Sequence, residues 1–360
     1  MAFTADELVN INNAALEHWI DKGKVWKQNV ANKPMLKAFN DRAGSFPGGK
    51  EFVSFGVKAG QGGGALQGYT GDDQVAYYNP TGLKRARTPW KEHHMGMVIT
   101  HTELKIDGID VIESGANSRT SEMSGREEHV LANLLDEKND TMGEDFAVSM
   151  DAYIHGDGSS DAKALAGIKS IILANPFVGS TFGLSRVANS WWRNDAATAA
   201  AAGAGGLGAI TSSAANGGAL IEAMDKAKRR RSKYAQGGMV TRYFAGSDFI
   251  DAYKKELRAN GNYTDTGWRG KTPDGSMDDP SHSGIKLEWD PTMDDIGEAK
   301  RCYAIDMGRT GLRLLYMDGQ RMKKHAPARP YDRYVMYNGV TTTCVMIAKQ
   351  LNTSGVYDIA

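Results

Sequence analysis

The stretch REEHVLANLLDEKNDTMGEDFAVSMDAYIHGDG, residues 126–158, decides the fold. Its apolar residues recur at spacings of three and four, which predicts one long amphipathic helix. They are Leu131, Leu134, Leu135, Met142, Phe146, Met150 and Tyr153. Ser124 is a suitable N-cap, and Gly156 and Gly158 end the helix because glycine tolerates the left-handed backbone of a C-terminus. We therefore predict a helix over residues 126–155 that divides the chain into two kinds of sequence.

The composition limits the classes of function. The 360 residues carry 43 basic and 43 acidic side chains, so the net charge is zero, which argues against a dedicated nucleic-acid binder. Low self-repulsion instead suits a protein that packs against copies of itself. Cys302 and Cys344 lie in apolar, strand-like runs and are expected to be buried thiols. We find no signal peptide and no apolar run long enough for a membrane helix, and therefore expect a soluble, cytoplasmically made chain.

The sequence before the long helix predicts an arm and a long excursion. Residues 1–48 contain two short helices, over 6–21 and 34–40, with too little apolar surface for a core. Strand-like alternation follows at 51–57 and again at Met95, Met97 and Ile99, and the segment between is rich in glycine and then in basic residues. A two-stranded excursion of this size is not stable alone in water. It is therefore either a flexible insertion or an element whose partner lies on another molecule.

The sequence after the long helix mixes strands and helices without a regular alternation. Residues 164–174 are apolar and strand-like, and the alanine- and glycine-rich residues 196–213 predict a mobile loop. Helices are predicted over 219–230 and from Ser247 onward. Strands are predicted at 239–245, 285–289, 301–307, 311–317, 334–337 and 341–348. This arrangement predicts an α+β fold.

Two patterns suggest cofactor or metal chemistry but lack its context. Gly203, Gly205 and Gly208 match the spacing G-x-G-x-x-G, but an alanine run stands where a dinucleotide-binding fold needs a strand. A flexible loop is the better interpretation. His93 and His94 are adjacent, so on a strand they face opposite sides, and with His101 they lack a Glu or Cys at zinc-ligand spacing. Surface or interface histidines explain them better.

Charged clusters give no active site either. The basic cluster comprises Lys226, Lys228, Arg229, Arg230, Arg231 and Lys233. It predicts a solvated helix end, with a phosphate contact or an inter-subunit ion-pair patch as alternatives. The acids between Asp136 and Asp145 spread around a helix, and Asp290, Asp294 and Asp295 do not form a calcium loop. We therefore predict no enzyme, no cofactor and no metal site.

The order of elements resembles the tailed-bacteriophage major capsid proteins of the Hong Kong 97 fold. The residues that carry the resemblance are MGEDFAVSMDAYIHGDGSS (142–160), ALAGIKSII (164–172), GLSRVANSWWRND (183–195) and GIKLEWDP (284–291) followed by RCYAIDM. It covers nearly the whole chain. It implies an N-terminal arm at 1–48 and an extended E-loop at 49–103. It also implies a peripheral domain at 104–160 and 311–360 with the spine helix at 126–155, and an axial domain at 161–310.

The resemblance also implies a function. The chain is expected to self-assemble, as hexamers and pentamers, into the icosahedral head shell of a virion that encloses double-stranded DNA. Portal, scaffolding and decoration proteins are further expected partners, and the scaffold is either a separate protein or a segment already removed. An encapsulin-like nanocompartment shell is the alternative within this fold, and an enzyme with a glycine-rich cofactor loop is the alternative outside it.

Assembly contacts are expected at basic and aromatic residues of the arm, the E-loop and the basic cluster. These residues are Trp19, Lys84, Arg85, Arg87, Trp90, Lys91, Arg229, Arg230 and Arg231. A covalent cross-link of Lys84 or Lys91 to Asn338, as some relatives form, has no supporting motif here. Deleting residues 60–87 is predicted to leave a folded subunit that does not assemble, and Phe146→Asp is predicted to unfold it by burying a charge.

Overall fold

The predicted long helix is the longest element of the structure. The computed structural model describes residues 32–59, 66–79, 82–106, 125–213, 218–235, 239–259, 280–325 and 335–360. Within these residues α4 (Gly125–His155) confirms the predicted helix. Ser124 and the side chains of Leu131, Leu134 and Leu135 lie outside the described part, as do the predicted helix at 6–21 and Trp19.

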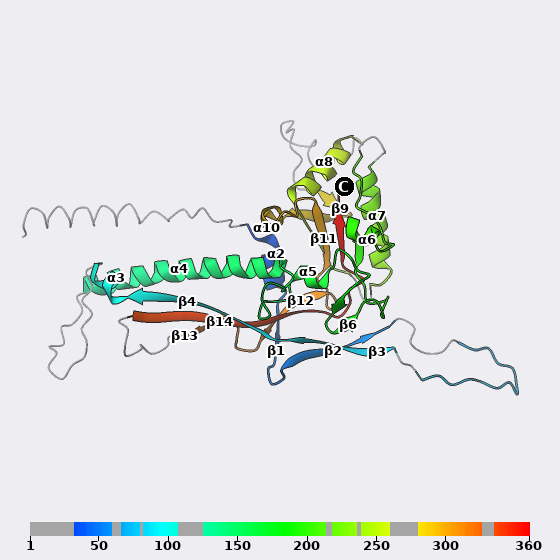
Figure 1. Cartoon of the computed structure of the whole chain (residues 1–360), viewed down its shortest axis with the longest axis horizontal. Coiled ribbons are helices and arrows are strands. Elements are labelled where there is room, and N and C mark those ends of the chain that lie inside the picture. Colours follow the sequence, from blue (N-terminus) through cyan, green and yellow to red (C-terminus); the bar gives the residue numbers. More distant parts are fainter. Residues whose placement is uncertain are drawn as a thin grey trace, which may run out of the picture. The chain divides into compact units, whose positions relative to one another are not determined.

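A five-stranded sheet lies along α4 (Figure 1). It comprises β1 (Gly44–Phe46), β12 (Leu312–Met317), β14 (Val335–Ala348), β13 (Lys323–His325) and β4 (Lys91–Thr100). Strand β14 pairs with β4 along the whole length of β4, from Thr100 opposite Val335 to Lys91 opposite Cys344. The two strands predicted at 334–337 and 341–348 are therefore one strand, because the ladder continues through Asn338 and Gly339.

The apolar stripe of α4 faces this sheet and α2 (Pro34–Asp41). Met150 is buried and Met142 and Phe146 are half-buried, as the spacing predicts. Ile154, with no exposed surface, occupies the core, whereas Tyr153 is 37% exposed and stacks on His93 of β4 with ring centroids 4.9 Å apart. The sequence therefore predicts the wrong core residue at this end of the helix: it selects Tyr153, whereas the next residue, Ile154, is the buried one.

The end of α4 is set by glycines. The Gly156 amide bonds the Ala152 carbonyl at 3.0 Å, and Gly158 has φ +73°. Gly167 lies against the last turn, since a Cβ there would be 2.3 Å from the Tyr153 carbonyl oxygen. A side chain at Gly167 would therefore force the helix end away from the chain that follows it.

A second sheet has six strands in the order β7 (Asp195–Ala197), β15 (Gly355–Asp358), β11 (Arg301–Asp306), β8 (Thr241–Ala245), β10 (Ile285–Trp289) and β9 (Ser281–His282). The predicted helices pack against it as α7 (Ala219–Ser232) and α8 (Ser247–Ala259). Leu220 and Met224 of α7 meet Phe249 and Tyr253 of α8 in one buried cluster. Helices and strands thus form a mixed α+β fold.

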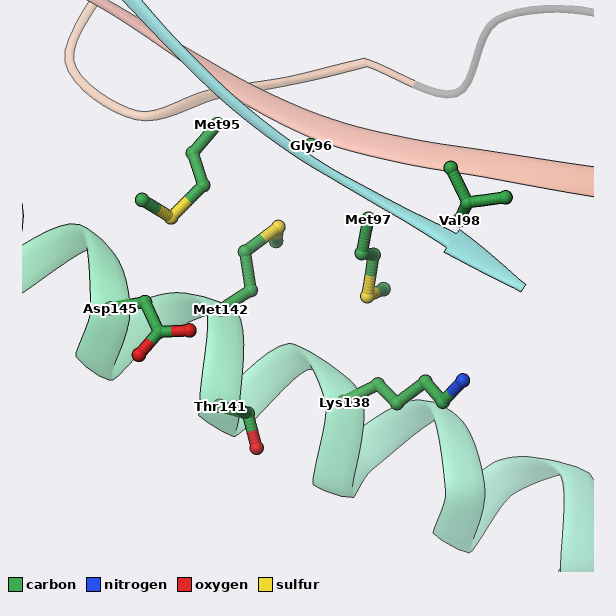
Figure 2. Close-up of a pocket in the computed structure, with 8 residues that line it drawn as sticks. All are labelled: Met95, Gly96, Met97, Val98, Lys138, Thr141, Met142 and Asp145. Atoms are coloured by element: carbon green, nitrogen blue, oxygen red, sulfur yellow. The ribbon is translucent and has the colours of Figure 1, made fainter.

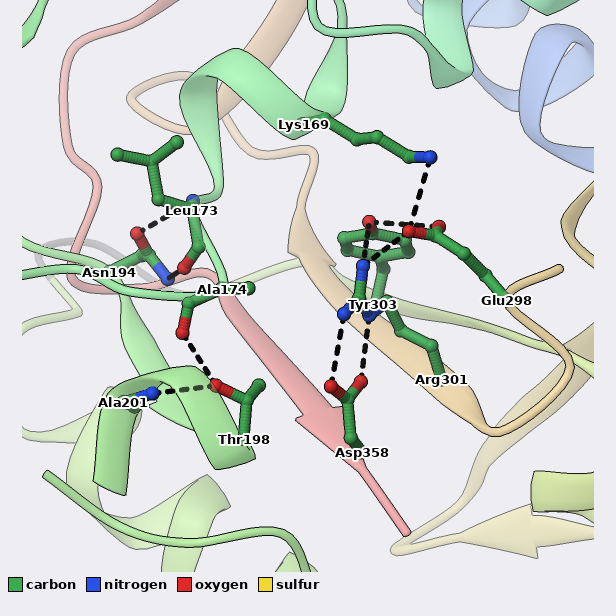
Figure 3. Close-up of polar contacts among 10 residues, drawn as sticks. All are labelled: Lys169, Leu173, Ala174, Asn194, Thr198, Ala201, Glu298, Arg301, Tyr303 and Asp358. Atoms are coloured by element: carbon green, nitrogen blue, oxygen red, sulfur yellow. Dashed lines mark hydrogen bonds and ion pairs between the residues drawn. The ribbon is translucent and has the colours of Figure 1, made fainter. Parts of the chain in front are cut away.

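The strand predicted at 164–174 is wrong. This segment contains the short helix α5 (Ile168–Ile171), and its end is held by side chains rather than by a strand ladder. Asn194 brackets Leu173 with two hydrogen bonds of 3.1 and 3.0 Å, and the Thr198 hydroxyl donates to the Ala174 carbonyl at 2.6 Å (Figure 3). The apolar run is buried because it lies in the core, not because it is in a sheet.

The mobile loop predicted at 196–213 is also wrong. Thr198 caps the helix α6 (Ala199–Ala202), and Ala201 has no exposed surface. Backbone hydrogen bonds then join Thr198 to Leu207 and Ile210 to Asp358. Small alanine side chains allow this close packing, so a low-complexity sequence is here an ordered one.

Charged side chains tie the end of the chain to β11. Arg301 holds the Asp358 carboxylate with two bonds of 2.7 and 3.0 Å and also contacts Glu298, which pairs with Lys169 at 3.1 Å (Figure 3). A bidentate guanidinium–carboxylate pair is among the stronger polar contacts in proteins. Cys302, the next residue of β11, is buried, as is Cys344, and burial raises the pKa of the Cys344 thiol to about 12. Both cysteines are buried free thiols, as predicted.

A buried carboxylate organises the start of α7. Glu256 of α8 accepts hydrogen bonds from the Leu220 and Ile221 amides at 2.9–3.1 Å, from the Ser213 amide at 2.9 Å and from the Ser212 hydroxyl at 3.1 Å. The glycine N-cap of α7 has no side chain to do this. Glu256 therefore supplies the cap from another helix.

Glu256→Gln is expected to destabilise the fold by about 2 kcal/mol, because it removes the charge and turns an amide N–H₂ toward buried donors. The matched control is Glu222→Gln, which removes an exposed i,i+4 partner of Lys226 and should change stability by under about 0.5 kcal/mol. Urea unfolding followed by circular dichroism measures both. Equal effects of the two substitutions would contradict the capping role.

Among the described helices, none is both long enough and apolar enough to cross a membrane.

Candidate assembly surfaces

The excursion before α4 is a two-stranded hairpin with two unlike faces. Strand β2 (Phe52–Lys58) pairs with β3 (Leu83–Pro89), from Phe52 opposite Pro89 to Lys58 opposite Leu83. The second strand of the excursion is therefore β3, not the strand predicted around Met95, because β4 belongs to the five-stranded sheet. The inner face is buried against the chain's own residues, so the base of the hairpin needs no other molecule.

The loop around residues 180–194 is the platform under the hairpin. Phe55 meets Phe182 edge to face at 5.5 Å, and the Arg87 amide donates to the Phe182 carbonyl at 3.0 Å. Arg186 holds the platform from inside, with no exposed surface. It donates to Thr181 Oγ1 at 2.9 Å and to Asn194 Oδ1 at 2.6 Å, both neutral acceptors. Burial in this setting lowers the pKa of Arg186 to about 10.

The outer face of the hairpin carries two of the predicted contact residues. Arg85 and Arg87 are exposed and lie two positions apart, so they share one face of β3. Arg87 also lies over the Phe52 ring, 5.8 Å from its centroid. Lys84 is turned the other way, where its ammonium bonds Asn189 of the platform at 2.6 Å. The structure thus brings Arg85 and Arg87 together and separates Lys84 from them.

The described tip of the hairpin, residues 66–79, exposes an unusual amount of aromatic surface. Tyr77 is 92% exposed and Tyr69 69%, and Leu66 and Tyr78 are also exposed. Gln67 braces the tip by bonding the Ala76 amide at 2.9 Å and the Tyr78 hydroxyl at 3.2 Å. Clustered exposed aromatic residues usually mark a contact surface. These tyrosines are not among the contact residues predicted above, although three of them fall within ten residues of the sequence.

Trp90 and Lys91 join the hairpin to the five-stranded sheet. Trp90 is half-buried with its ring 6.2 Å from that of Phe46, and the Lys91 ammonium donates to the Ala162 carbonyl. Asn338 is paired with Met97 in the β4–β14 ladder. Lys84 and Lys91 thus have their own partners, Asn189 and Ala162, and the structure adds no support for a cross-link to Asn338.

The predicted basic cluster divides into exposed and buried members. Arg231 has no exposed surface, so the prediction of a solvated helix end is wrong for it. Its guanidinium lies 5.6 Å from the Tyr243 ring centroid and 5.9 Å from that of Tyr357, and it donates to the Tyr243 hydroxyl at 3.1 Å. Aromatic faces stabilise a guanidinium away from water. Arg231 therefore stabilises the subunit itself.

Arg229 and Arg230 lie on the same helix but differ in surroundings. Arg230 binds both carboxylate oxygens of Asp195 at 3.1 and 3.0 Å, and Asp195 also accepts from the Tyr357 hydroxyl at 2.8 Å. Arg229 is exposed. Of the three arginines, Arg229 alone presents its charge freely to a neighbouring molecule or to solvent.

A buried ionic group at the end of α4 was missed in the sequence. His155, Asp151 and Asp290 are all buried, and Asp290 is the N-cap of α10 (Pro291–Asp295). His155 Nε2 lies 3.0 Å from Asp290 Oδ2. The signal available was the spacing of Asp151 and His155 on one helix face. The partner Asp290 lies 135 positions from His155, and no local pattern points to it.

A hollow of about 370 Å³ lies between α4 and β4. Figure 2 shows Met95 and Met97 directed toward the helix and Val98 directed away from it, with Met142, Lys138, Thr141 and Asp145 on the helix side. Flexible methionine side chains are suited to lining such an irregular gap. The polar side chains of its lining are Lys138, Thr141 and Asp145, all from α4.

The other candidate sites do not assemble. His93 faces α4 and His94 the opposite side, and in the described part of the chain no three His, Cys, Asp or Glu side chains are placed to hold a metal ion. Gly203 and Gly205 follow the helix α6 rather than precede one, so the dinucleotide-binding pattern lacks a helix N-terminus for phosphate. Asp140, Glu144 and Asp145 are exposed on α4.

Compared by sequence, the chain matches no protein-family model and no curated protein. Compared by structure, it resembles a chain of the cyanophage A-1(L) capsid asymmetric unit with a TM-score of 0.63 and 15% identity, over 94% of this chain and 96% of that one. A chain of the Myoviridae phage XM1 capsid gives 0.52 and 12% identity, over 94% and 95%. A chain of the capsid of a native GTA particle gives 0.51 and 12%, over 94% and 97%.

The chain has a phage-capsid fold of the Hong Kong 97 type. The resemblance drawn from the sequence is thereby confirmed at the level of the fold. Identities of 15% and 12% mean that the shared property of these Hong Kong 97-type chains is the arrangement of elements rather than particular side chains.

Proposed function

We propose that this chain is a major capsid protein, whose copies assemble into an icosahedral shell around double-stranded DNA. The observation that carries the proposal is the correspondence with the cyanophage A-1(L) capsid chain. It extends over 94% of this chain and 96% of the other, leaving little of either sequence for a separate activity. The protein is accordingly a structural component of a virion and not an enzyme.

The parts of the chain take the following roles in this proposal. Residues 1–48 are the N-terminal arm, and the β2–β3 hairpin is the E-loop. The five-stranded sheet with α4 as spine helix is the peripheral domain, and the six-stranded sheet is the axial domain. The strand pairings support two changes to the boundaries taken from the sequence. The E-loop ends at Pro89, before β4, and β15 at the end of 311–360 belongs to the axial sheet.

The hairpin supplies the contact between copies. Its base is anchored on its own platform, while its tip exposes Tyr69, Tyr77 and Tyr78. A contact made by the tip of one copy with a different surface of the next is heterologous, and such contacts close into rings when the rotation permits. The units of the shell are hexamers and pentamers built in this way. Arg85 and Arg87 lie on the exposed face of each hairpin.

Other partners follow from the same role. A scaffolding protein and a portal are needed to start and shape a DNA-filled head, and a decoration protein is a further candidate. With zero net charge, the chain meets packaged DNA by weak, non-specific contact rather than by sequence recognition.

Sedimentation and nuclease protection of the expressed protein test the proposal, in the presence and absence of its scaffold. Particles of shell size that protect double-stranded DNA in infected cells support the capsid role. Particles that instead retain an enzyme cargo and no DNA favour the nanocompartment shell. A small, soluble oligomer under every condition contradicts both shells and reopens an enzymatic role.

A further inference from the structure

The C-terminal end of α4 is joined to α10 by three buried ionisable side chains. His155 is 3% exposed, Asp151 1% and Asp290 not at all. Asp151 and His155 belong to α4, and Asp290 begins α10. The same two elements meet through Met293, Met150 and Ile154 in the main apolar core. A polar group at this place therefore links two elements that are far apart in the sequence.

The hydrogen-bond partners of His155 suit a charged ring opposite an ionised Asp290. Nδ1 lies 2.8 Å from the Asp151 carbonyl oxygen, and Nε2 lies 3.0 Å from Asp290 Oδ2. A carbonyl oxygen can only accept a hydrogen bond, and the same is true of an ionised carboxylate. Both ring nitrogens must then carry hydrogen, which makes the ring an imidazolium. Asp290 Oδ1 is committed to the Thr292 amide at 3.1 Å, so the carboxylate is held in this orientation.

The charges that face the ring come from three elements. Asp151 Oδ1 of α4 lies 3.6 Å from His155 Nδ1 and has no hydrogen-bond partner. Asp151 Oδ2 accepts a hydrogen bond from the Thr292 hydroxyl at 2.6 Å. Asp290 comes from the start of α10. Lys33, next to α2, acts on Asp151 from a greater distance. Two carboxylates thus share one imidazolium in a buried site, and each depends on it for compensation.

We propose that His155 is a pH-sensitive latch, which holds α10 on the end of α4 while its ring is protonated and releases α10 when the proton is lost. On deprotonation one ring nitrogen becomes an acceptor facing an acceptor, and two buried carboxylates lose their counter-charge. α10 is a single short turn, and besides this ionic group it is attached by its buried Met293 in the main core. It also fixes an exposed side chain, because Asp294 accepts the Trp289 indole N–H at 2.7 Å. The latch therefore couples pH to the surface formed by Trp289 and α10.

The direction of the effect follows from the protonation states. Burial lowers the pKa of His155, but the hydrogen bond and charge of Asp290 and the charge of Asp151 outweigh it, so the pKa lies above 6.5. Burial also raises the pKa of Asp151 above its usual range. Both groups bind protons more tightly in the folded state. The contribution of His155 to stability is full below its unfolded pKa and is lost as the pH rises through its folded pKa, whereas that of Asp151 is full only below the lower unfolded pKa of a carboxyl group.

Two other histidines make the whole-protein stability a poor readout. Burial lowers the pKa of His93 and of His282, so these two groups favour folding as the pH rises. Their effect opposes that of His155. A local measurement at α10 separates the contributions.

Hydrogen–deuterium exchange of the full chain, read on peptides covering residues 290–298, tests the latch. The reporting amides include Ile296, bonded to the Thr292 carbonyl at 3.1 Å, and Glu298, bonded to the Met293 carbonyl at 2.8 Å. After correction for intrinsic exchange, protection in the wild type is expected to fall at least about tenfold between about pH 6 and about pH 9. Peptides from β11 are expected to show no matching change.

Asp290→Asn is the matched variant. Asparagine is an equally good N-cap, so the bond to the Thr292 amide persists while the charge is removed. Protection of α10 is expected to be low in His155→Asn and independent of pH in both variants, because in Asp290→Asn the new side-chain amide donates to a neutral His155 Nε2 at every pH. The latch is refuted if wild-type α10 keeps its protection across the range, or if Asp290→Asn keeps the wild-type pH dependence.

Two features keep the test decisive. If a variant does not fold, the pH dependence of protection in wild-type α10, compared with that in β11, still tests the latch. The NMR titration of the His155 imidazole is a second test, and its midpoint must lie above about pH 6.5. The measurement needs no shell, so a failure of the latch leaves the capsid proposal untouched, and the reverse also holds.

Discussion

A subunit in which residues 60–81 are replaced by Asn-Gly is expected to fold but not to assemble. The Ala59 amide donates to the Gly82 carbonyl at 2.9 Å, so these residues already stand opposite each other and a two-residue turn can join them. The replacement removes the tyrosine-bearing tip and keeps β2 and β3. The longer deletion of residues 60–87 drawn from the sequence would also remove most of β3 and uncover Val53, Phe55 and Val57.

Thermal unfolding and gradient sedimentation together measure this prediction. The melting temperature should stay within a few degrees of wild type, because the tip contributes little buried surface. Shells and capsomers should be absent. A milder pair, Tyr77→Ser and Tyr78→Ser, should weaken assembly without changing the fold, whereas Val187→Ser removes an equally exposed apolar side chain elsewhere and serves as the control. Normal shells from the shortened hairpin would rule out its role as the connector.

Ile154→Asp is expected to unfold the subunit. Ile154 has no exposed surface and lies in the main core, where a carboxylate finds no partner. An unpaired buried charge costs more than about 4 kcal/mol, a large part of the stability of a typical domain. Phe146→Asp, predicted from the sequence to unfold the chain, should cost only about 1–3 kcal/mol, because Phe146 is half-buried and the charge reaches water.

Val148→Asp is the matched control for this pair. Val148 lies on the same helix, is 41% exposed, and should accept the charge with a change of under about 1 kcal/mol. Soluble yield and chemical unfolding of the three variants give the order Val148, Phe146, Ile154 from mildest to most severe. A soluble, cooperatively folding Ile154→Asp subunit would show that this face of α4 is not part of the core.

The sequence predicted those elements whose signal is local and periodic. Helices α4, α7 and α8 and most late strands have apolar residues at regular spacing, and the structure has them within a few residues. A two-stranded excursion was predicted from the alternation at 51–57 and around Met95, but its second strand is β3 and not β4. The fold as a whole was predicted from the order of these elements, which the structural comparisons confirm.

The errors share one cause, which is that long-range contacts override local pattern. Residues 164–174 are apolar enough for a strand, but Asn194 and Thr198 hold their end as irregular backbone. The alanine-rich segment after Thr198 suggests mobility, yet small side chains let it pack closely. Arg231 sits in a basic run that predicts solvent, but Tyr243 and Tyr357 of neighbouring strands enclose it. None of these partners can be located from spacing alone.

The contact residues were predicted less well than the fold. Arg85 and Arg87 remain on an exposed face, whereas Lys84, Lys91 and Arg231 are used within the chain. The exposed tyrosines of the tip were not selected, because exposure is a property of the folded chain. A sequence shows which residues suit an interface but not which of them the fold leaves free.

Cryo-electron microscopy of the assembled protein tests the central claim most directly. The expected result is closed icosahedral shells in which each hairpin leaves its own subunit beyond Lys58 and Leu83 and lays its tip, with Tyr69, Tyr77 and Tyr78, on a neighbouring copy. Purified protein that forms no shell or capsomer with its scaffold present, or shells in which the tip contacts only its own subunit, would contradict it.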